Sequence, residues 1–279
     1  MLERSSSAVP ALNPTKQQRK RRRDIAVASM KVIEACISFV VLFLLWEAII
    51  RLFEVRPYLV PAPTAIASAL WDGFSSGLYV TAARVTLTEV LLGLLAGTII
   101  GISVGTLLVT IPILDRLFYP YVVALQTLPK VAIAPLFIIW FGFGIESKIV
   151  IVILACTFPI LVNTIAGLRS TEADRIALIK ALCGSSRQLF WYVQFPSALP
   201  YIFAGLNTAV VLAIIGAIVG EFVGGRQGIG VQIIQANFSM NIASVFALIV
   251  ILATIGIILS GVVRVAEAKI CFWKGKSVK

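Results

Sequence analysis

The chain has 279 residues, of which 59% are hydrophobic and only 13% are charged. Since a soluble domain carries roughly 25% charged residues, this composition excludes a water-soluble fold and indicates a polytopic membrane protein. The formal charge of +11 would suggest a nucleic-acid partner in a soluble protein. In a membrane protein it indicates orientation instead, and we expect no nucleic-acid partner.

Hydrophobic stretches predict an all-α protein with six transmembrane helices, each near the ~20 residues that a bilayer core requires. Their expected positions are about 32–52, 87–111, 118–140, 149–168, 200–222 and 245–264. We divide the chain into a basic tail over 1–31, a first transmembrane helix within 32–56, a core over 57–264 and a second basic tail over 265–279. The core contains the other five helices.

Basic residues are concentrated on one side of these predicted helices. Eighteen of the 24 Lys and Arg residues lie in the N-terminal tail, in the connections 112–117 and 169–199, or from Arg264 onward. Because cytoplasmic connections carry an excess of Lys and Arg, we expect both termini to lie in the cytoplasm.

Four glycines at a spacing of four residues lie on one face of the second predicted helix: Gly93, Gly97, Gly101 and Gly105. Helices in lipid associate by close backbone approach along such small residues. The stripe therefore predicts helix packing rather than a ligand site.

The third predicted helix is interrupted by Pro120, Pro129 and Pro135, which remove backbone hydrogen bonds and kink a membrane helix. Gln126 and Lys130 lie four residues apart beside this interruption. A lysine deep in a membrane helix is a candidate functional residue, although its side chain can also extend to the membrane surface.

The connection 169–199 is longer than a simple turn requires and has the pattern of folded structure. Thr171 and Asp174 have the spacing of a capping box, and apolar residues follow at helical intervals. Turn residues at 184–186 precede a second short helix, which we expect to end before Pro196. A folded loop of this length indicates a surface for a partner protein. A helix that lies on lipid headgroups is the alternative.

Four groups of motifs follow one another around the predicted helices. They are Pro61-Ala62-Pro63; Gln126-Thr127-Leu128-Pro129 with Ala134-Pro135-Leu136 and Trp140-Phe141-Gly142; Phe195-Pro196-Ser197-Ala198-Leu199-Pro200-Tyr201; and Ala204-Gly205-Leu206 with Gly216-Ala217 and Gly220-Glu221-Phe222. Over about residues 57–263 the chain resembles the inner-membrane permease subunits of bacterial ATP-binding-cassette importers. It is most similar to the branch for nitrate, sulfonates, taurine and thiamine-pyrimidine precursors.

The loop signature of that family is Glu-Ala-Ala, three residues, Gly, nine residues, an aliphatic residue, one further residue and then Leu-Pro. Counted back from Pro196, its glycine falls on Cys183, one residue before Gly184. The triplet falls on 177–179, where the acidic residue is absent. The resemblance implies that residues 174–186 form a coupling helix that docks on an ATPase. The residues implied in coupling are Asp174, Ala177, Leu178, Ile179, Cys183, Gly184 and Pro196.

The resemblance further implies a type I importer permease bundle in the bacterial inner membrane, with no catalytic residue, cofactor or metal site of its own. ATP and Mg²⁺ would bind to a separate ATPase dimer, because Gly275-Lys276-Ser277 lacks the P-loop glycine at Ile270. A periplasmic or lipid-anchored binding protein would deliver a small solute. A second permease subunit, expected to be another copy of this chain, would complete the path through the bilayer.

Polar residues in apolar helices tend to face the bundle interior. The candidates for a translocation path are Gln126, Lys130, Asn163, Asn207 and Glu221. For the two asparagines we expect hydrogen bonding between helices rather than solute contact, and Glu221 could also face the binding protein or cap a turn. A secondary transporter driven by an ion gradient is the alternative function, although the chain has no evident inverted repeat. A membrane scaffold or channel subunit is the third possibility.

Overall fold

The computed structural model describes residues 30, 34 and 37–273. The chain forms two units, Met1–Thr64 and Ala65–Lys279. In the first unit a helix covers residues 37–52. Its Glu47 forms an ion pair with Arg51 at 2.6 Å and accepts hydrogen bonds from the amide and the hydroxyl of Thr64. The first predicted transmembrane helix begins among residues outside the described part.

From Pro63 onward the described chain is almost entirely helical, and residues 37–273 contain no strand. The elements are α2 (Pro63–Ser75), α3 (Leu78–Thr110), α4 (Pro112–Thr127), the 3₁₀ turn η1 (Lys130–Ile133), α5 (Ala134–Phe141), α6 (Ile145–Arg169), α7 (Ala173–Ala181), α8 (Ser186–Leu189), the π-helical turn η2 (Phe190–Gln194), α9 (Phe195–Gly224), α10 (Ile229–Phe238) and α11 (Ile242–Ile270). The all-α prediction is therefore confirmed.

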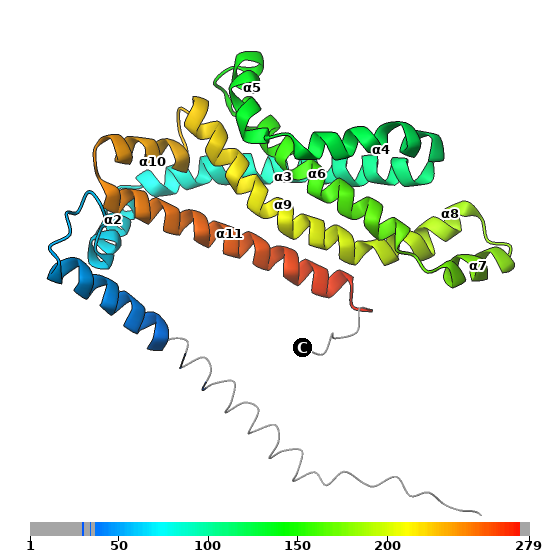
Figure 1. The fold of residues 1–279 in the computed structure, drawn as a ribbon, viewed down its shortest axis with the longest axis horizontal. Helices are drawn as coiled ribbons and strands as arrows, with labels where there is room; N and C mark the ends of the chain where they lie inside the picture. The colour runs from blue at the N-terminus through cyan, green and yellow to red at the C-terminus, as the bar shows by residue number, and fades with distance from the viewer. Residues whose placement is uncertain (1–29, 31–33, 35–36, 274–279) are drawn as a thin grey trace, which may run out of the picture. The chain divides into compact units, whose positions relative to one another are not determined.

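Four helical segments in the described part are long and apolar enough to cross a membrane. They are α3, α6, the continuous segment from α8 through α9, and α11. In the second unit these segments run lengthwise, with α7 and α8 at one end and α10 at the other (Figure 1). Helix α6 packs between α3 and α9, and α11 packs on α9.

The glycine stripe of α3 packs directly on α6, as its spacing predicts. A Cβ atom added to Gly97 would lie 3.0 Å from the Cβ atom of Cys156. Eight residues further along both helices, a Cβ atom added to Gly105 would lie 3.0 Å from that of Thr164. Because the residue numbers rise together along the contact, α3 and α6 run parallel.

Helix α9 packs on the other side of α6 and runs antiparallel to it. A Cβ atom added to Gly205 would lie 2.9 Å from the Asn163 Cβ atom. One added to Gly220 would lie 2.9 Å from the Lys148 Cγ atom. The three helices enclose an apolar core of Val90, Val152, Cys156, Ile160, Ala209, Ala213 and Ala217. Small residues on α3 and α9 thus allow the three backbones to approach closely.

The third predicted helix, 118–140, is not a single helix. It is divided between α4, η1 and α5, with a break at Leu128 and Pro129. Leu128 has extended backbone (φ −63°, ψ 135°), the conformation that a following proline favours. Helix α4 has 16 residues and α5 has 8. Each is shorter than the ~20 residues that a bilayer core requires, so neither crosses a membrane on its own. The predicted number of six helices is therefore not confirmed.

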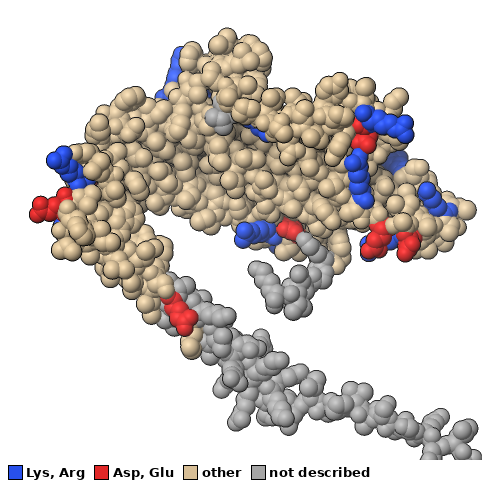
Figure 2. All heavy atoms as spheres, in the orientation of Figure 1, with Lys and Arg blue, Asp and Glu red and all other residues tan. Residues whose placement is uncertain are grey.

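The outward faces of the long helices are apolar and exposed. Leu95 and Ile99 on α3 are 61% and 59% exposed, and Ile257 on α11 is 74% exposed. Most of the face in Figure 2 is uncharged, and charged side chains gather around the end that carries α7 and α8. Such a surface is suited to contact with lipid along the helices and with water at that end.

Candidate functional site

The connection between α6 and α9 contains α7, whose start differs from the sequence prediction. The Thr171 hydroxyl donates to the Leu168 carbonyl at 3.1 Å, so it belongs to the end of α6. The N-cap residue of α7 is Glu172, which pairs with Arg175 at 2.9 Å and makes no capping hydrogen bond through its side chain. The predicted capping box of Thr171 and Asp174 is therefore wrong.

Helix α7 ends in a tight turn at Cys183 and Gly184. The Gly184 amide donates to the Ile179 carbonyl at 2.9 Å, and the Cys183 amide donates to the Lys180 carbonyl at 3.0 Å. This is the Schellman pattern, which requires a left-handed residue between the helix and the last donor. Cys183 has that backbone, with a φ of 55°. It therefore occupies the position that glycine usually takes and at which the permease loop signature has its glycine.

We expect Cys183→Gly to stabilise this turn. A left-handed backbone costs a residue with a Cβ atom about 1–2 kcal/mol. Replacing cysteine with glycine removes this cost from the folded state. It also gives the unfolded chain more conformational freedom, which lowers the free energy of unfolding by about 0.4–1 kcal/mol. A net gain of about 0.5–1 kcal/mol should slow amide hydrogen exchange in α7 roughly two- to fivefold.

Gly184→Ala is the matched control, because a Cβ atom there would lie 2.6 Å from the Ile179 Cγ2 atom. We expect this variant to accelerate exchange in α7. Faster exchange in Cys183→Gly would contradict the assignment of the turn.

Helix α8 begins with a capping box that sequence analysis did not identify. The Ser185 hydroxyl accepts from the Gln188 amide at 3.3 Å, and the Gln188 side chain accepts from the Ser185 amide at 2.8 Å. The predicted end of this helix before Pro196 is wrong. Residues 190–194 form one π-helical turn, and α9 follows directly. In a regular α-helix the Pro196 ring would clash with the Tyr192 carbonyl four residues earlier, and here the preceding turn is π-helical, with the Phe195 amide bonded to the Phe190 carbonyl.

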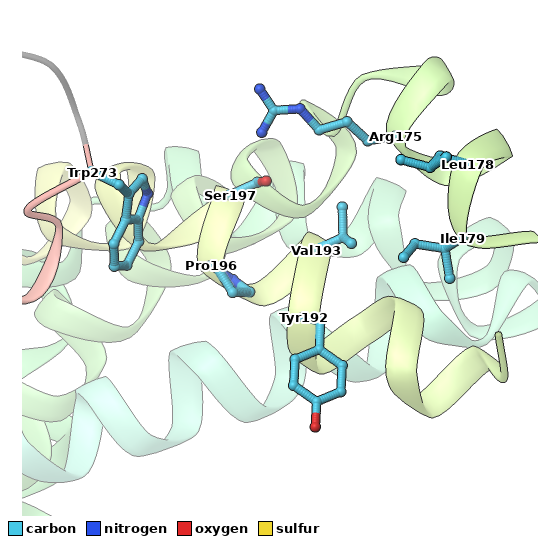
Figure 3. A pocket seen from close by; sticks show the side chains of 8 residues that line it. All are labelled: Arg175, Leu178, Ile179, Tyr192, Val193, Pro196, Ser197 and Trp273. Carbon is cyan, nitrogen blue, oxygen red and sulfur yellow. The ribbon is translucent and has the colours of Figure 1, made fainter. Parts of the chain in front are cut away.

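A cavity of about 350 Å³ lies between α7, the start of α9 and the residues after α11. It is lined by Arg175, Leu178, Ile179, Tyr192, Val193, Pro196, Ser197 and Trp273 (Figure 3). Leu178 and Tyr192 are 60% and 76% exposed. The cavity is thus an open, mostly apolar groove along the loop.

The residues predicted for coupling lie on this loop, but they do not form one enclosed pocket. Asp174, Ala177, Leu178 and Cys183 are exposed, and Ile179, Gly184 and Pro196 are partly buried. Leu182, which was not among the predicted residues, is 70% exposed. The loop therefore presents an uncovered apolar face that is fixed by a Schellman turn on one side and a capping box on the other.

Gln126 and Lys130 lie at the break between α4 and α5. Gln126 is exposed, and its backbone carbonyl accepts a hydrogen bond from the Lys130 ammonium at 3.1 Å. The ammonium also lies 5.1 Å from the centre of the Phe158 ring on α6. The break thus brings a partly buried cation against the core.

Asn163 and Asn207 do not form the predicted hydrogen bonds between helices. Asn163 donates to the Pro159 carbonyl at 2.8 Å, and Asn207 donates to the Phe203 carbonyl at 3.1 Å, each within its own helix. The Asn207 Oδ1 atom is buried and has no hydrogen-bond partner in the described part of the chain. Neither asparagine forms a hydrogen bond with Lys130 in the described part of the chain.

Glu221 is only 1% exposed, so it faces neither solvent nor an open path. Its carboxylate accepts hydrogen bonds from the Thr86 hydroxyl and from the Gly230 amide at the start of α10. Of the roles expected for Glu221, these contacts fit the capping of a turn, the one that leads into α10. Thr86 and Glu89 beside it were not identified from the sequence, although they continue the face of the glycine stripe toward the start of α3.

Comparison with known proteins gives a consistent result. The family model described as "Binding-protein-dependent transport system inner membrane component" matches residues 93–270. The formylaminopyrimidine transport permease protein of Halalkalibacterium halodurans is 36% identical over 248 residues, which cover 89% of this chain and 98% of that protein. The riboflavin transport system permease protein of Chloroflexus aurantiacus is 34% identical, with 85% and 89% covered.

Solved structures share the fold. The structure of an amino acid ABC transporter with histidines has a TM-score of 0.60 at 15% identity and covers 72% of this chain and 97% of that one. An inward-facing MetNI methionine ABC transporter has a TM-score of 0.56 at 22% identity, with 68% and 97% covered. None of the proteins named here is described as driven by an ion gradient.

Proposed function

Because the chain belongs to the family of binding-protein-dependent transport system inner-membrane components and is a permease subunit of an ATP-driven importer, we propose that α7 docks on a separate ATPase subunit. The observation that carries this proposal is the exposed apolar face of α7, with Leu178 and Leu182 60% and 70% exposed. Exposed apolar side chains on a rigid element at a charged, water-facing end favour a protein groove as their partner.

The same loop is directly connected to two core helices, so a displacement of the loop can be transmitted to them. Helix α6 leads into it, and the helical segment from Ser186 to Gly224 leads out of it without interruption. Since α6 and α9 are packed along their length, a displacement of α7 by the ATPase would act on two core helices together. Alternating access to the two sides of the membrane would follow from this motion.

We propose six membrane crossings with both termini in the cytoplasm. Helices α3 and α6 run parallel, so the segment between them has to return across the bilayer if both cross it. Asp115 near the start of this segment pairs with Arg169 at 2.6 Å, at the loop end of α6. Near its other end, Ile138 contacts Gly224 at the end of α9. The helix over 37–52 would supply the remaining crossing.

The further partners are proposed from the family. The ATPase dimer would hold ATP and Mg²⁺, a binding protein would deliver the solute, and a second copy of this chain would complete the path. Gln126 and Lys130 remain the candidates to contact solute among the predicted path residues. The names of the relatives favour a small organic solute, because they include permeases for a formylaminopyrimidine and for riboflavin.

Binding of the cognate ATPase subunit to membrane vesicles tests both the docking and the orientation. We expect the ATPase to bind to inverted vesicles that contain this chain, because their cytoplasmic face is outward. Right-side-out vesicles and inverted vesicles without the chain should not bind it. Binding to right-side-out vesicles that contain the chain would overturn the proposed orientation. Equal binding to inverted vesicles with and without the chain would overturn the proposed docking.

A further inference from the structure

A buried polar cluster lies at the end of the second unit opposite α7 and α8. It contains Thr86 and Glu89 on α3, Lys148 on α6 and Glu221 on α9, and each of these residues is at most 3% exposed. Charged groups buried among apolar helices are costly unless they are paired. Three charged side chains and a hydroxyl buried at one point therefore indicate a specific role.

Two of these residues hold the start of α10. The Thr86 hydroxyl donates to a Glu221 carboxylate oxygen at 2.6 Å and accepts from the Ile229 amide at 2.9 Å. The other Glu221 oxygen accepts from the Gly230 amide. Ile229 and Gly230 are the first two residues of α10, and their amides have no partner within the helix. Side chains from α3 and α9 thus supply the cap for α10.

The glycine-rich turn before α10 is shaped around the carboxylate. Gly228 has a φ of 125°, and a Cβ atom on it would overlap the Glu221 carboxyl group. A Cβ atom on Gly230 would lie 2.8 Å from a Glu221 carboxylate oxygen. Glycine at both positions therefore allows the turn to close directly over Glu221.

The other two residues surround this contact. The Lys148 ammonium donates to the Phe143 and Gly144 carbonyls at 3.0 Å and 2.9 Å, which fixes the turn between α5 and α6. Glu89 is buried on α3 three residues after Thr86, and its Oε2 atom has no hydrogen-bond partner in the described part of the chain. The ends of α3, α6 and α9 and the start of α10 are consequently joined through one buried cluster.

Glu221 also lies near the far end of the helical segment that begins in the loop. This segment has 39 residues, which corresponds to about 58 Å at 1.5 Å per residue. Its first turns belong to the loop beside α7, and its last turn carries Glu221. A rigid element that connects two sites can carry coupling between them.

We propose that Thr86 and Glu221 form a latch that makes α10 move with α9, so that displacement of the α7 loop reaches the opposite end of the second unit. Thr86 and Glu221 are positioning residues in this role and do not contact solute. The proposal rests on the proposed function for its link to ATP hydrolysis. The attachment of α10 to α3 and α9 stands without it.

Thr86→Val tests the latch, because valine keeps the shape of threonine but neither accepts from Ile229 nor donates to Glu221. Thr86→Ser retains the hydroxyl and should rescue. Thr88→Val is the matched control, since the Thr88 hydroxyl is exposed and bonds only to the Arg84 carbonyl of its own helix, at 2.8 Å. The variants are compared in the full complex with ATPase and binding protein in lipid nanodiscs.

The first measurement is amide hydrogen exchange in α10. We expect Thr86→Val to exchange about tenfold faster than the wild type, which corresponds to one buried donor left without a partner. Thr86→Ser and Thr88→Val should remain within about twofold of the wild type, since no buried group loses its partner. Unchanged exchange in Thr86→Val would overturn the latch.

The second measurement is the stimulation of ATP hydrolysis by solute-loaded binding protein. We expect Thr86→Val to lose most of the stimulation while the unstimulated rate is kept, and Thr86→Ser to restore it. If Thr86→Val exchanges faster in α10 but keeps full stimulation of ATP hydrolysis, Thr86 has only a structural role and the proposal is overturned. If the wild-type complex shows no stimulation, the proposed function fails, while the exchange measurement still decides the attachment of α10. Should Thr86→Val not accumulate, Glu221→Gln is measured by both methods with the same criteria.

Discussion

The double variant Leu178→Asp, Leu182→Asp is expected to abolish binding of the ATPase subunit and ATP-driven uptake, while the protein still inserts and folds. Leu178 on α7 and Leu182, the C-cap residue of that helix, are 60% and 70% exposed, so the folded chain loses little packing. In the complex, each carboxylate would be buried against a groove without a partner. Loss of one central apolar anchor of an interface costs about 2 kcal/mol or more, which is at least about thirtyfold in affinity. Binding is measured by titrating ATPase onto vesicles, and folding by gel filtration in detergent.

Lys180→Asp is the matched control for this prediction. Lys180 is exposed on the same helix but lies about 200° around the axis from Leu178, on the opposite face. We expect it to retain binding within about threefold, as exposed charge changes usually do. Equal loss in the control would show that charge rather than the apolar face matters. Full ATPase binding by the double variant would favour the alternative in which α7 lies on lipid headgroups.

Spacing along the chain was sufficient to predict one close helix contact of the fold. Steps of four residues keep the α3 glycines on one face, and that face lies against another helix as expected. The identity of the partner could not be predicted, because α6 shows no matching stripe of small residues. The residues of α6 at this contact include Val152 and Cys156. Such residues are common in any apolar helix and do not mark α6 as the partner.

The loop was recognised from its length and composition, but its local geometry was not. A proline rule predicts a helix end before Pro196, whereas a π-helical turn carries the helix past it. Similarly, a cysteine does not by itself indicate the left-handed backbone found at Cys183, and only the family signature, which has glycine at this position, points to it. Both features are imposed by the way in which the loop must join two packed helices, and this information is not local in sequence.

The buried cluster was only partly predictable for the same reason. In the sequence Glu221 is recognisable as a carboxylate at the end of a predicted apolar helix, and the glycines that follow it, Gly228 and Gly230, are typical of a turn. The hydrogen bond from Thr86 to Glu221, however, joins residues 135 positions apart. Extending the glycine face of α3 backward leads to Thr86 and Glu89, which would have marked them as buried polar groups but not named their partner.

A Cβ atom at Gly93 is expected to separate α3 from α6 and to destabilise the protein strongly. Such an atom would overlap the Val152 side chain on α6, and Val152 is fully buried in the core. Overpacking a core usually costs about 1–3 kcal/mol, and here a whole helix has to move. For Gly93→Ala we expect a fall in Tm of roughly 6–12 °C. The measurement uses a thiol-reactive dye after the thiols that react in the folded protein, including the exposed Cys183, have been blocked. Cys156 is buried against Gly97 and becomes reactive as this contact opens.

Gly261→Ala on α11 makes the same chemical change where no atom lies within 4 Å of the added group. Its Tm should change by less than about 2 °C, and alanine's higher helix propensity favours a small increase. The exchange Gly93→Val with Val152→Gly returns the displaced volume to the opposite helix. It should therefore recover part of the stability that Gly93→Val alone loses, since neighbouring substitutions in one contact are not additive. If Gly93→Ala and Gly261→Ala had the same Tm, the parallel contact of α3 and α6, and with it the return of residues 112–141 across the bilayer, would be refuted.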